Sequence, residues 1–232
     1  MDLLLYIILI TLVFVGLKLI PARIKYNKSQ YQHISGNKFF KTVFDKGNYG
    51  EFLTFCMLEK LGESNILTNI YLPKKDGTTT EVDLLLVNAT GIYVFESKNY
   101  SGWIFGNEKN KMWTQSLKGG KKNKFFNPIW QNKGHISALD EYLDTQYTDY
   151  FYSYIIFSQR CELKKVSYSS PNVSVIKRND LMRALKKCIA ISPNKLSPEE
   201  VGDIYSKLKS RTLADEDTKK RHIEEIRAKH NM

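Results

Sequence analysis

The hydrophobic pattern begins with an almost uninterrupted apolar run. Residues 3–17 read LLLYIILITLVFVGL, and Leu19 and Ile20 extend the run past one charged residue, Lys18. Roughly 18 helical residues at about 1.5 Å each span about 27 Å, close to the thickness of a hydrocarbon core. The run predicts a transmembrane anchor over residues 1–20. A cleaved signal peptide is the alternative, which the acidic Asp2 and the lack of a small-residue cleavage site disfavour.

The stretch after this run is polar and basic. Arg23, Lys25 and Lys28 follow Lys18, and the first acidic residue after the run is Asp45. By the positive-inside rule, this bias keeps the following domain in the cytoplasm. Residues 21–46 therefore read as a basic linker, and the sequence predicts a single-pass protein of the cell membrane.

Alternating and helical periodicities then predict an α/β domain over residues 47–210. Residues 51–61 have apolar positions at helical spacing, with Gly62 as a C-cap. The runs 65–72, 79–87 and 91–98 are rich in β-forming residues and are separated by short turns, which predicts an antiparallel meander. A further hairpin is expected from residues 102–105 and 111–115.

The second half of this domain continues the mixed pattern. Asn127 and Pro128 are favoured N-cap and first-turn residues, so residues 129–143 should be helical. Strands are expected at 152–157 and 173–176, and helices at 181–189 and 198–208. Residues 211–232 form a charged tail with too few apolar residues to hold a core. The predicted fold is a mixed sheet flanked by helices.

Composition limits the kinds of partner and site that this chain can have. The 232 residues carry a formal net charge of +11, which favours a polyanionic partner such as nucleic acid or an anionic membrane surface. The three cysteines are far apart and the four histidines include no pair at zinc-ligand spacing, so a disulfide framework and a zinc site are not indicated. No phosphate-binding loop of the GxxxxGK[ST] type is present.

Acidic residues in the predicted meander are candidates for catalysis. The period of two places Asp83 on the face of Leu85 and Val87, where an unpaired carboxylate is costly. The same period places Glu96 and Lys98 on one face of the next strand. Glu51, at the predicted start of the preceding helix, is a third carboxylate that can reach the same place.

Such a group suits a hard divalent cation. Mg²⁺ and Mn²⁺ prefer carboxylate and water oxygens, so Glu51, Asp83 and Glu96 are the predicted ligands of one such ion. The ammonium of Lys98 can orient a metal-bound water and neutralise charge that develops on a phosphate. This combination predicts hydrolysis of phosphodiester bonds.

The surrounding residues resemble a known family. Asp, a spacer, then Glu-x-Lys is the arrangement of the PD-(D/E)xK nuclease superfamily, although Val82 replaces the superfamily's proline. The segments GNYGEF (47–52), EVDLLLV (81–87), GIYVFESKNYSGWIFG (91–106) and NPIWQNKGHISAL (127–139), together with Trp113 and Gln115, are similar to the nuclease-related domain (NERD) family over about residues 39–143.

The resemblance implies a restriction-endonuclease-like core, a divalent metal and a nucleic-acid substrate, in bacterial proteins that often carry a membrane segment. We take DNA as the expected substrate. The family's acidic and lysine positions correspond to Glu51, Asp83, Glu96 and Lys98. Its polar helix corresponds to Asn127 and Gln131, which adds Gln131 to the candidate site. Residues after Leu143 lie outside the similar region.

Simpler explanations exist for the site residues other than Asp83. Glu51 can favour a helix N-terminus through the macrodipole, and Glu96 with Lys98 can be an ordinary surface ion pair. Gln131 can be a surface residue of its helix. A non-catalytic nucleic-acid-binding or membrane-scaffold module that keeps the nuclease fold is therefore the alternative function.

A lysine-rich segment supplies a candidate nucleic-acid surface. Its lysines alternate with aromatic residues, a mixture that suits phosphate contacts and base stacking. The alternative is a solvated loop over aromatic residues of the core. The predicted contacts are Lys118, Lys121, Lys122, Lys124 and Trp113.

Overall fold

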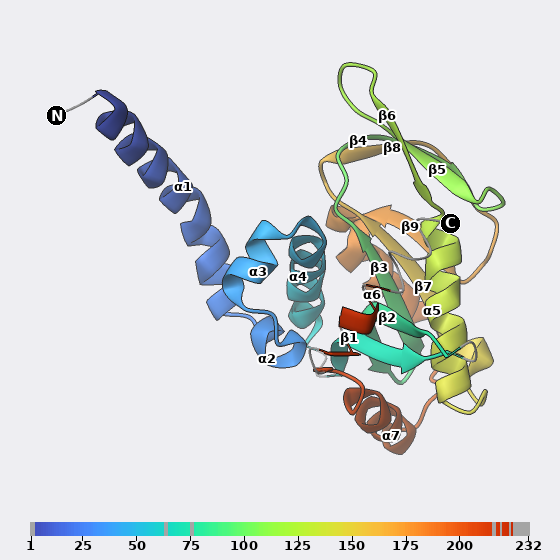
Figure 1. Cartoon of the computed structure of the whole chain (residues 1–232). Coiled ribbons are helices and arrows are strands. Elements are labelled where there is room, and N and C mark those ends of the chain that lie inside the picture. Colours follow the sequence, from blue (N-terminus) through green and yellow to red (C-terminus); the bar gives the residue numbers. More distant parts are fainter. Residues whose placement is uncertain are drawn as a thin grey trace.

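The computed structural model describes residues 3–62, 65–74, 77–214, 217–218, 220–222 and 224, which form a mixed α/β fold with two sheets (Figure 1). The first sheet has the order β1-β2-β3-β7-β9. Its strands are β1 (Ile66–Pro73), β2 (Thr79–Asn88), β3 (Gly91–Lys98), β7 (Phe151–Phe157) and β9 (Val173–Lys177). β1, β2 and β3 pair antiparallel, as predicted, whereas β3, β7 and β9 pair parallel.

The second sheet has the order β6-β5-β4-β8. Its strands are β4 (Gly102–Asn107), β5 (Met112–Ser116), β6 (Lys122–Phe126) and β8 (Cys161–Ser167). The predicted hairpin is the antiparallel pair of β4 and β5. β6 and β8 were not predicted, and the prediction of one mixed sheet is wrong in this respect.

Helices cover both faces of the first sheet (Figure 1). α4 (Lys46–Leu58) and α6 (Leu181–Ile191) pack on one face, and α5 (Pro128–Tyr142) and α7 (Pro198–Lys209) pack on the other. A third apolar cluster, which includes Ile104, Trp113 and Phe157, joins the second sheet to the first. α5, α6 and α7 lie close to their predicted positions, whereas α4 begins five residues before its predicted start.

The stretch predicted as a linker contains short helices, α2 (Tyr31–Ser35) and α3 (Phe39–Phe44). Tyr31 is fully buried and packs edge-on against Phe52 and Phe55 of α4. These aromatic contacts attach the stretch to the domain. Three short 3₁₀ helices complete the fold: η1 (Glu59–Leu61), η2 (Thr148–Tyr150) and η3 (Arg178–Asp180). Most of the predicted charged tail, including Glu225 and Lys229, lies outside the described residues.

The N-terminal helix, α1 (Leu3–Asn27), projects away from the rest of the fold (Figure 1). Among the described residues, no helix is long and apolar enough to cross a membrane. The uninterrupted apolar run before Lys18 has roughly 15 residues, or about 22 Å, which is shorter than a hydrocarbon core of about 30 Å. The predicted transmembrane helix and the single-pass membrane location are therefore wrong, and a membrane partner is not supported.

Candidate active site

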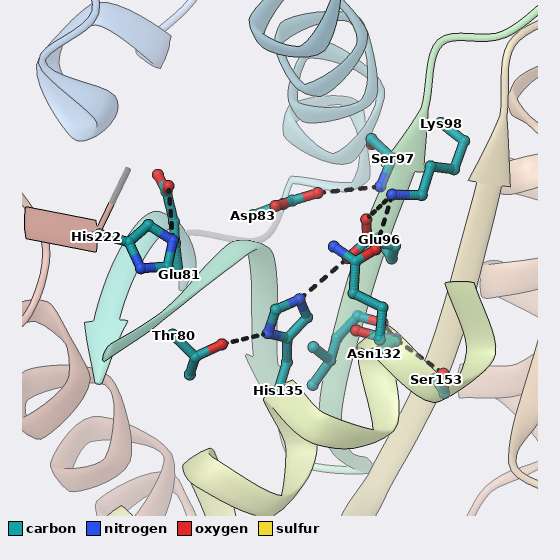
Figure 2. Close-up of polar contacts among 12 residues, drawn as sticks. Thr80, Glu81, Asp83, Glu96, Ser97, Lys98, Asn132, His135, Ser153 and His222 are labelled. Carbon is teal, nitrogen blue, oxygen red and sulfur yellow. Dashed lines mark hydrogen bonds and ion pairs between the residues drawn. The ribbon is translucent and has the colours of Figure 1, made fainter. Parts of the chain in front are cut away.

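Polar side chains converge at the end of β3 (Figure 2). Lys98 Nζ donates hydrogen bonds to Glu96 Oε1 at 2.6 Å and to Gln131 Oε1 of α5 at 2.9 Å. Burial opposes the charge of Lys98, but the charges of Glu96 and Asp83 outweigh this effect and raise its pKa. The structure therefore brings the predicted residues Glu96, Lys98 and Gln131 together, with the lysine charged.

The second oxygen of Glu96 is held by a histidine. His135 of α5 places Nε2 at 3.2 Å from Glu96 Oε2 and Nδ1 at 2.9 Å from Thr80 Oγ1 (Figure 2). Burial acts to raise the pKa of Glu96, yet Lys98 and His135 together lower it, so Glu96 stays ionised although it is only 1% exposed. Sequence reasoning missed His135; its spacing of four from Gln131, on one face of a helix, was the available signal.

Asp83 lies at an irregularity of β2. Val82 packs in the same apolar cluster as Leu85 and Val87, so the alternation of faces breaks at Asp83. The register with β1 passes from Thr68↔Leu84 to Ile70↔Val82, and the opposing residue Asn69 has a φ of +53°. The Asp83 carboxylate instead accepts a hydrogen bond from the backbone N–H of Ser97 at 3.3 Å (Figure 2). This break turns Asp83 toward β3.

Glu51 belongs to the second turn of α4, not to its start. Asp45 is the N-cap and accepts from the backbone N–H of Asn48 at 2.8 Å, so the helix begins at Lys46. Burial, followed by the charges of Glu81, Glu96 and Asp45, raises the pKa of Glu51 to about 8. The macrodipole explanation of Glu51 loses its basis, because Asp45 occupies the cap.

Negative charge exceeds positive charge at this site. Burial, then the charges of Glu96 and Glu51, raises the pKa of Asp83 well above its usual value. Glu81 also acts on both Asp83 and Glu51, and Lys98 is the cation that opposes all of these effects. Glu51, Asp83 and Glu96 thus lie around one lysine, and the first two hold their protons more tightly than usual, whereas Glu81 faces His222 at 3.9 Å.

A divalent cation suits this centre in charge and in donor type. Carboxylate oxygens are the preferred ligands of Mg²⁺ and Mn²⁺. Burial and the neighbouring carboxylates raise the pKa values of Glu51 and Asp83, so the loss of their protons is favoured by a nearby cation. Within the described ranges, however, no three His, Cys, Asp or Glu side chains are grouped to hold a metal ion. Both oxygens of Glu96 are engaged, one by Lys98 and the other by His135.

Comparisons with known proteins identify the family of this chain. The model of the family described as nuclease-related domain matches residues 46–158. A Bacillus anthracis protein, named only as uncharacterized, is 34% identical over 186 residues, which cover 79% of this chain and 85% of that protein. This chain belongs to the nuclease-related domain (NERD) family. No solved structure matches it.

The NERD match confirms the resemblance seen in the sequence and indicates a nuclease-related function. The matched region contains every predicted catalytic residue: Glu51, Asp83, Glu96, Lys98 and Gln131. It also contains His135, and it ends before α6 and α7. The polar centre at β3 is therefore part of the NERD region itself.

The predicted nucleic-acid contacts lie on the hairpin of β5 and β6. Lys118, Lys121, Lys122 and Lys124 are exposed there. Trp113 is only 1% exposed: its ring stacks on Phe157 and its Nε1 donates to the backbone oxygen of Asn107 at 3.0 Å. Trp113 therefore has no free face for a base, and its prediction as a stacking residue needs correction. The contact of the exposed lysines with nucleic acid stays a prediction.

Proposed function

We propose that this NERD protein hydrolyses phosphodiester bonds of nucleic acid, with DNA as the first candidate, in a reaction that needs Mg²⁺ or Mn²⁺. The observation that carries the proposal is the excess of carboxylates around Lys98. Burial and mutual repulsion raise the pKa values of Glu51 and Asp83 in a site that is part of a nuclease-related domain. Such an arrangement destabilises the isolated domain and is relieved by a cation.

Each residue then has a defined task. Glu51, Asp83 and Glu96 would hold the ion, which supplies an activated water and neutralises phosphate charge when it is bound. Lys98 stays charged and can stabilise negative charge that develops on the phosphate. Gln131 fixes the Lys98 ammonium. His135 is a positioning residue, because its contact with Thr80 fixes the ring that holds Glu96.

The second candidate function is a nucleic-acid-binding module without turnover. The feature that favours it is that the described residues hold no ready-made group of three metal ligands. The two candidates differ in one respect that can be measured: a binding module does not need the negative charge of Asp83, whereas hydrolysis does.

The deciding experiment measures cleavage of plasmid and single-stranded DNA, and of RNA, with Mg²⁺, Mn²⁺ or EDTA. We expect cleavage with either ion, none with EDTA, and none for Asp83→Asn with folding intact. Asp149→Asn, which removes an exposed carboxylate from η2, is the matched control and should cleave like the parent. If the parent cleaves no nucleic acid, or if Asp83→Asn cleaves at the parent's rate, the binding module is the better assignment.

A further inference from the structure

A second polar pocket lies at the same end of β3, beside the start of α4. Its volume is about 330 Å³, and its polar lining comes from four segments of the chain. The lining includes Lys46, Tyr49, Asn99, Ser158, Arg160 and Arg178. Three of these residues are cations, and they come from regions that are far apart in the sequence.

Arg178 is a buried guanidinium without a counter-ion. It is 5% exposed, its Nε donates to Thr54 Oγ1 at 3.3 Å, and its Nη2 has no hydrogen-bond partner in the described structure. Burial, and then the positive charge of Arg160, lowers its pKa. A buried charge without a partner is costly, so such a group in a folded protein calls for a ligand.

The other two cations are also without carboxylate partners. Arg160 Nη2 donates to the backbone and side-chain oxygens of Asn99, at 3.0 Å each, which turns the guanidinium toward the pocket wall. The side chain of Asn99 in turn donates to the backbone oxygen of Lys46 at 2.8 Å. No ion pair involves Lys46, Arg160 or Arg178 within the part of the chain that the structure describes. The pocket therefore has a local excess of positive charge.

Gly50 of α4 keeps this wall open. A Cβ at this position would lie 2.9 Å from Asn99 Cβ and 3.5 Å from Arg178 Nη2. A side chain here would collide with Asn99 and cover the unpartnered nitrogen.

We propose that this pocket binds a phosphate group of the nucleic-acid substrate, held by Arg178, Arg160 and Lys46. Arginine is well suited to this task, because its planar fork of N–H donors matches phosphate oxygens. A hydrogen-bond chain connects the pocket to the carboxylate centre: Thr54 Oγ1 contacts both Arg178 Nε and Ser97 Oγ, and Ser97 N–H donates to Asp83. The substrate class rests on the proposed function, whereas affinity for phosphate itself does not.

Calorimetry with inorganic phosphate tests the pocket. The full chain is titrated in EDTA at constant ionic strength, with chloride as the reference anion, so neither metal nor cleavage is involved. We expect the parent to bind phosphate more tightly than chloride and Arg160→Gln to lose about tenfold or more in affinity. Arg183→Gln is the matched control, since Arg183 is 83% exposed and pairs with Asp180.

A measurement of unfolding temperature and one further variant test whether lost affinity reflects lost folding. Arg160 is exposed, so Arg160→Gln should unfold at the parent's temperature. Arg178→Lys keeps the buried charge but loses the fork, and we expect the affinity for phosphate to fall in this variant too. If the parent shows no preference for phosphate over chloride, or if Arg160→Gln binds phosphate as the parent does, the pocket proposal is overturned.

Oligonucleotides distinguish the two sources of phosphate. In EDTA, parent and Arg160→Gln are compared on one single strand with and without a 5′-phosphate. If the 5′-phosphate strengthens parent binding and Arg160→Gln removes that gain, the pocket takes a terminal phosphate. If Arg160→Gln weakens both strands equally, the pocket takes an internal phosphate. If Arg160→Gln binds each strand as tightly as the parent does, the pocket does not hold a phosphate of the substrate. If a variant that no longer binds phosphate still cleaves nucleic acid, the pocket proposal fails while the nuclease assignment stands.

Discussion

The raised pKa of Glu51 makes a quantitative prediction about stability. In the unfolded chain this carboxyl loses its proton near its ordinary value of 4.5, whereas the folded protein keeps the proton up to about 8. Between these values the folded state binds more protons, so the free energy of unfolding must fall as the pH rises. At about 1.4 kcal/mol for each pH unit, Glu51 alone removes at most about 5 kcal/mol once the pH exceeds 8.

Glu51→Gln removes this effect, because glutamine has the same shape and no charge to lose. We expect parent and variant to be about equally stable near pH 5, and the variant to be more stable by several kcal/mol near pH 8.5. Urea unfolding in EDTA at both pH values and near pH 7 measures the difference. Glu199→Gln, at an exposed position in the first turn of α7, should follow the parent throughout. A difference between Glu51→Gln and the parent that stayed the same at every pH would refute the reasoning.

Four other measurements follow from the same contacts. Near pH 8, Mg²⁺ should raise the unfolding temperature of the parent more than that of Asp83→Asn, because the ion relieves repulsion that the variant already lacks; an equal rise would speak against a shared ion. Lys98→Met should abolish cleavage and cost about 3 kcal/mol of stability, since it leaves buried Glu96 without its lysine. The control Lys207→Met breaks an exposed pair with Asp144 and should cost less than about 1 kcal/mol. His135→Phe should cost about 1 to 3 kcal/mol by leaving Thr80 Oγ1 and Glu96 Oε2 without the ring as a partner, and unchanged stability would show that water replaces the ring. Replacing Lys118, Lys121, Lys122 and Lys124 with Gln should reduce the slope of log affinity against log salt by up to about 3. An unchanged slope would show that these lysines belong to a solvated loop and do not contact nucleic acid.

The strands of the meander could be predicted because their residues alternate and their turns are short. β3 was predicted with the bounds that the structure has, Gly91–Lys98. β6 and β8 were missed because their sequences, KNKFF and CELKKVS, carry several lysines and leave one side of the strand exposed. A strand of this kind gains its stability from its neighbours in the sheet, which sequence periodicity does not record.

The site was predicted in its residue types but not in its arrangement. The identity of Glu96 and Lys98 followed from the motif, whereas the break at Asp83 depends on Asn69 of the neighbouring strand. Asp45 was not considered as the N-cap of α4, and the position of Glu51 in the helix was therefore wrong. Arg178 lies 80 positions beyond Lys98, on an element outside the family match, so no local pattern connects it to the site. These features depend on tertiary packing.

The two polar regions at the end of β3 differ in charge: one contains the carboxylates and the other contains the arginines. The carboxylate centre repels a polyanion when its acids are ionised, because Glu51, Asp83 and Glu96 lie around one lysine there. Successive residues of a strand point to opposite faces, so Glu96 and Lys98 contact α5 while Ser97 contacts Thr54 of α4. The cations Arg160 and Arg178 lie on the side of Ser97, and hydrogen bonds through Thr54 and Ser97 connect Arg178 to Asp83. An arrangement of this kind can attract phosphate through the arginines and leave Glu51 and Asp83 to exchange their protons for a metal ion.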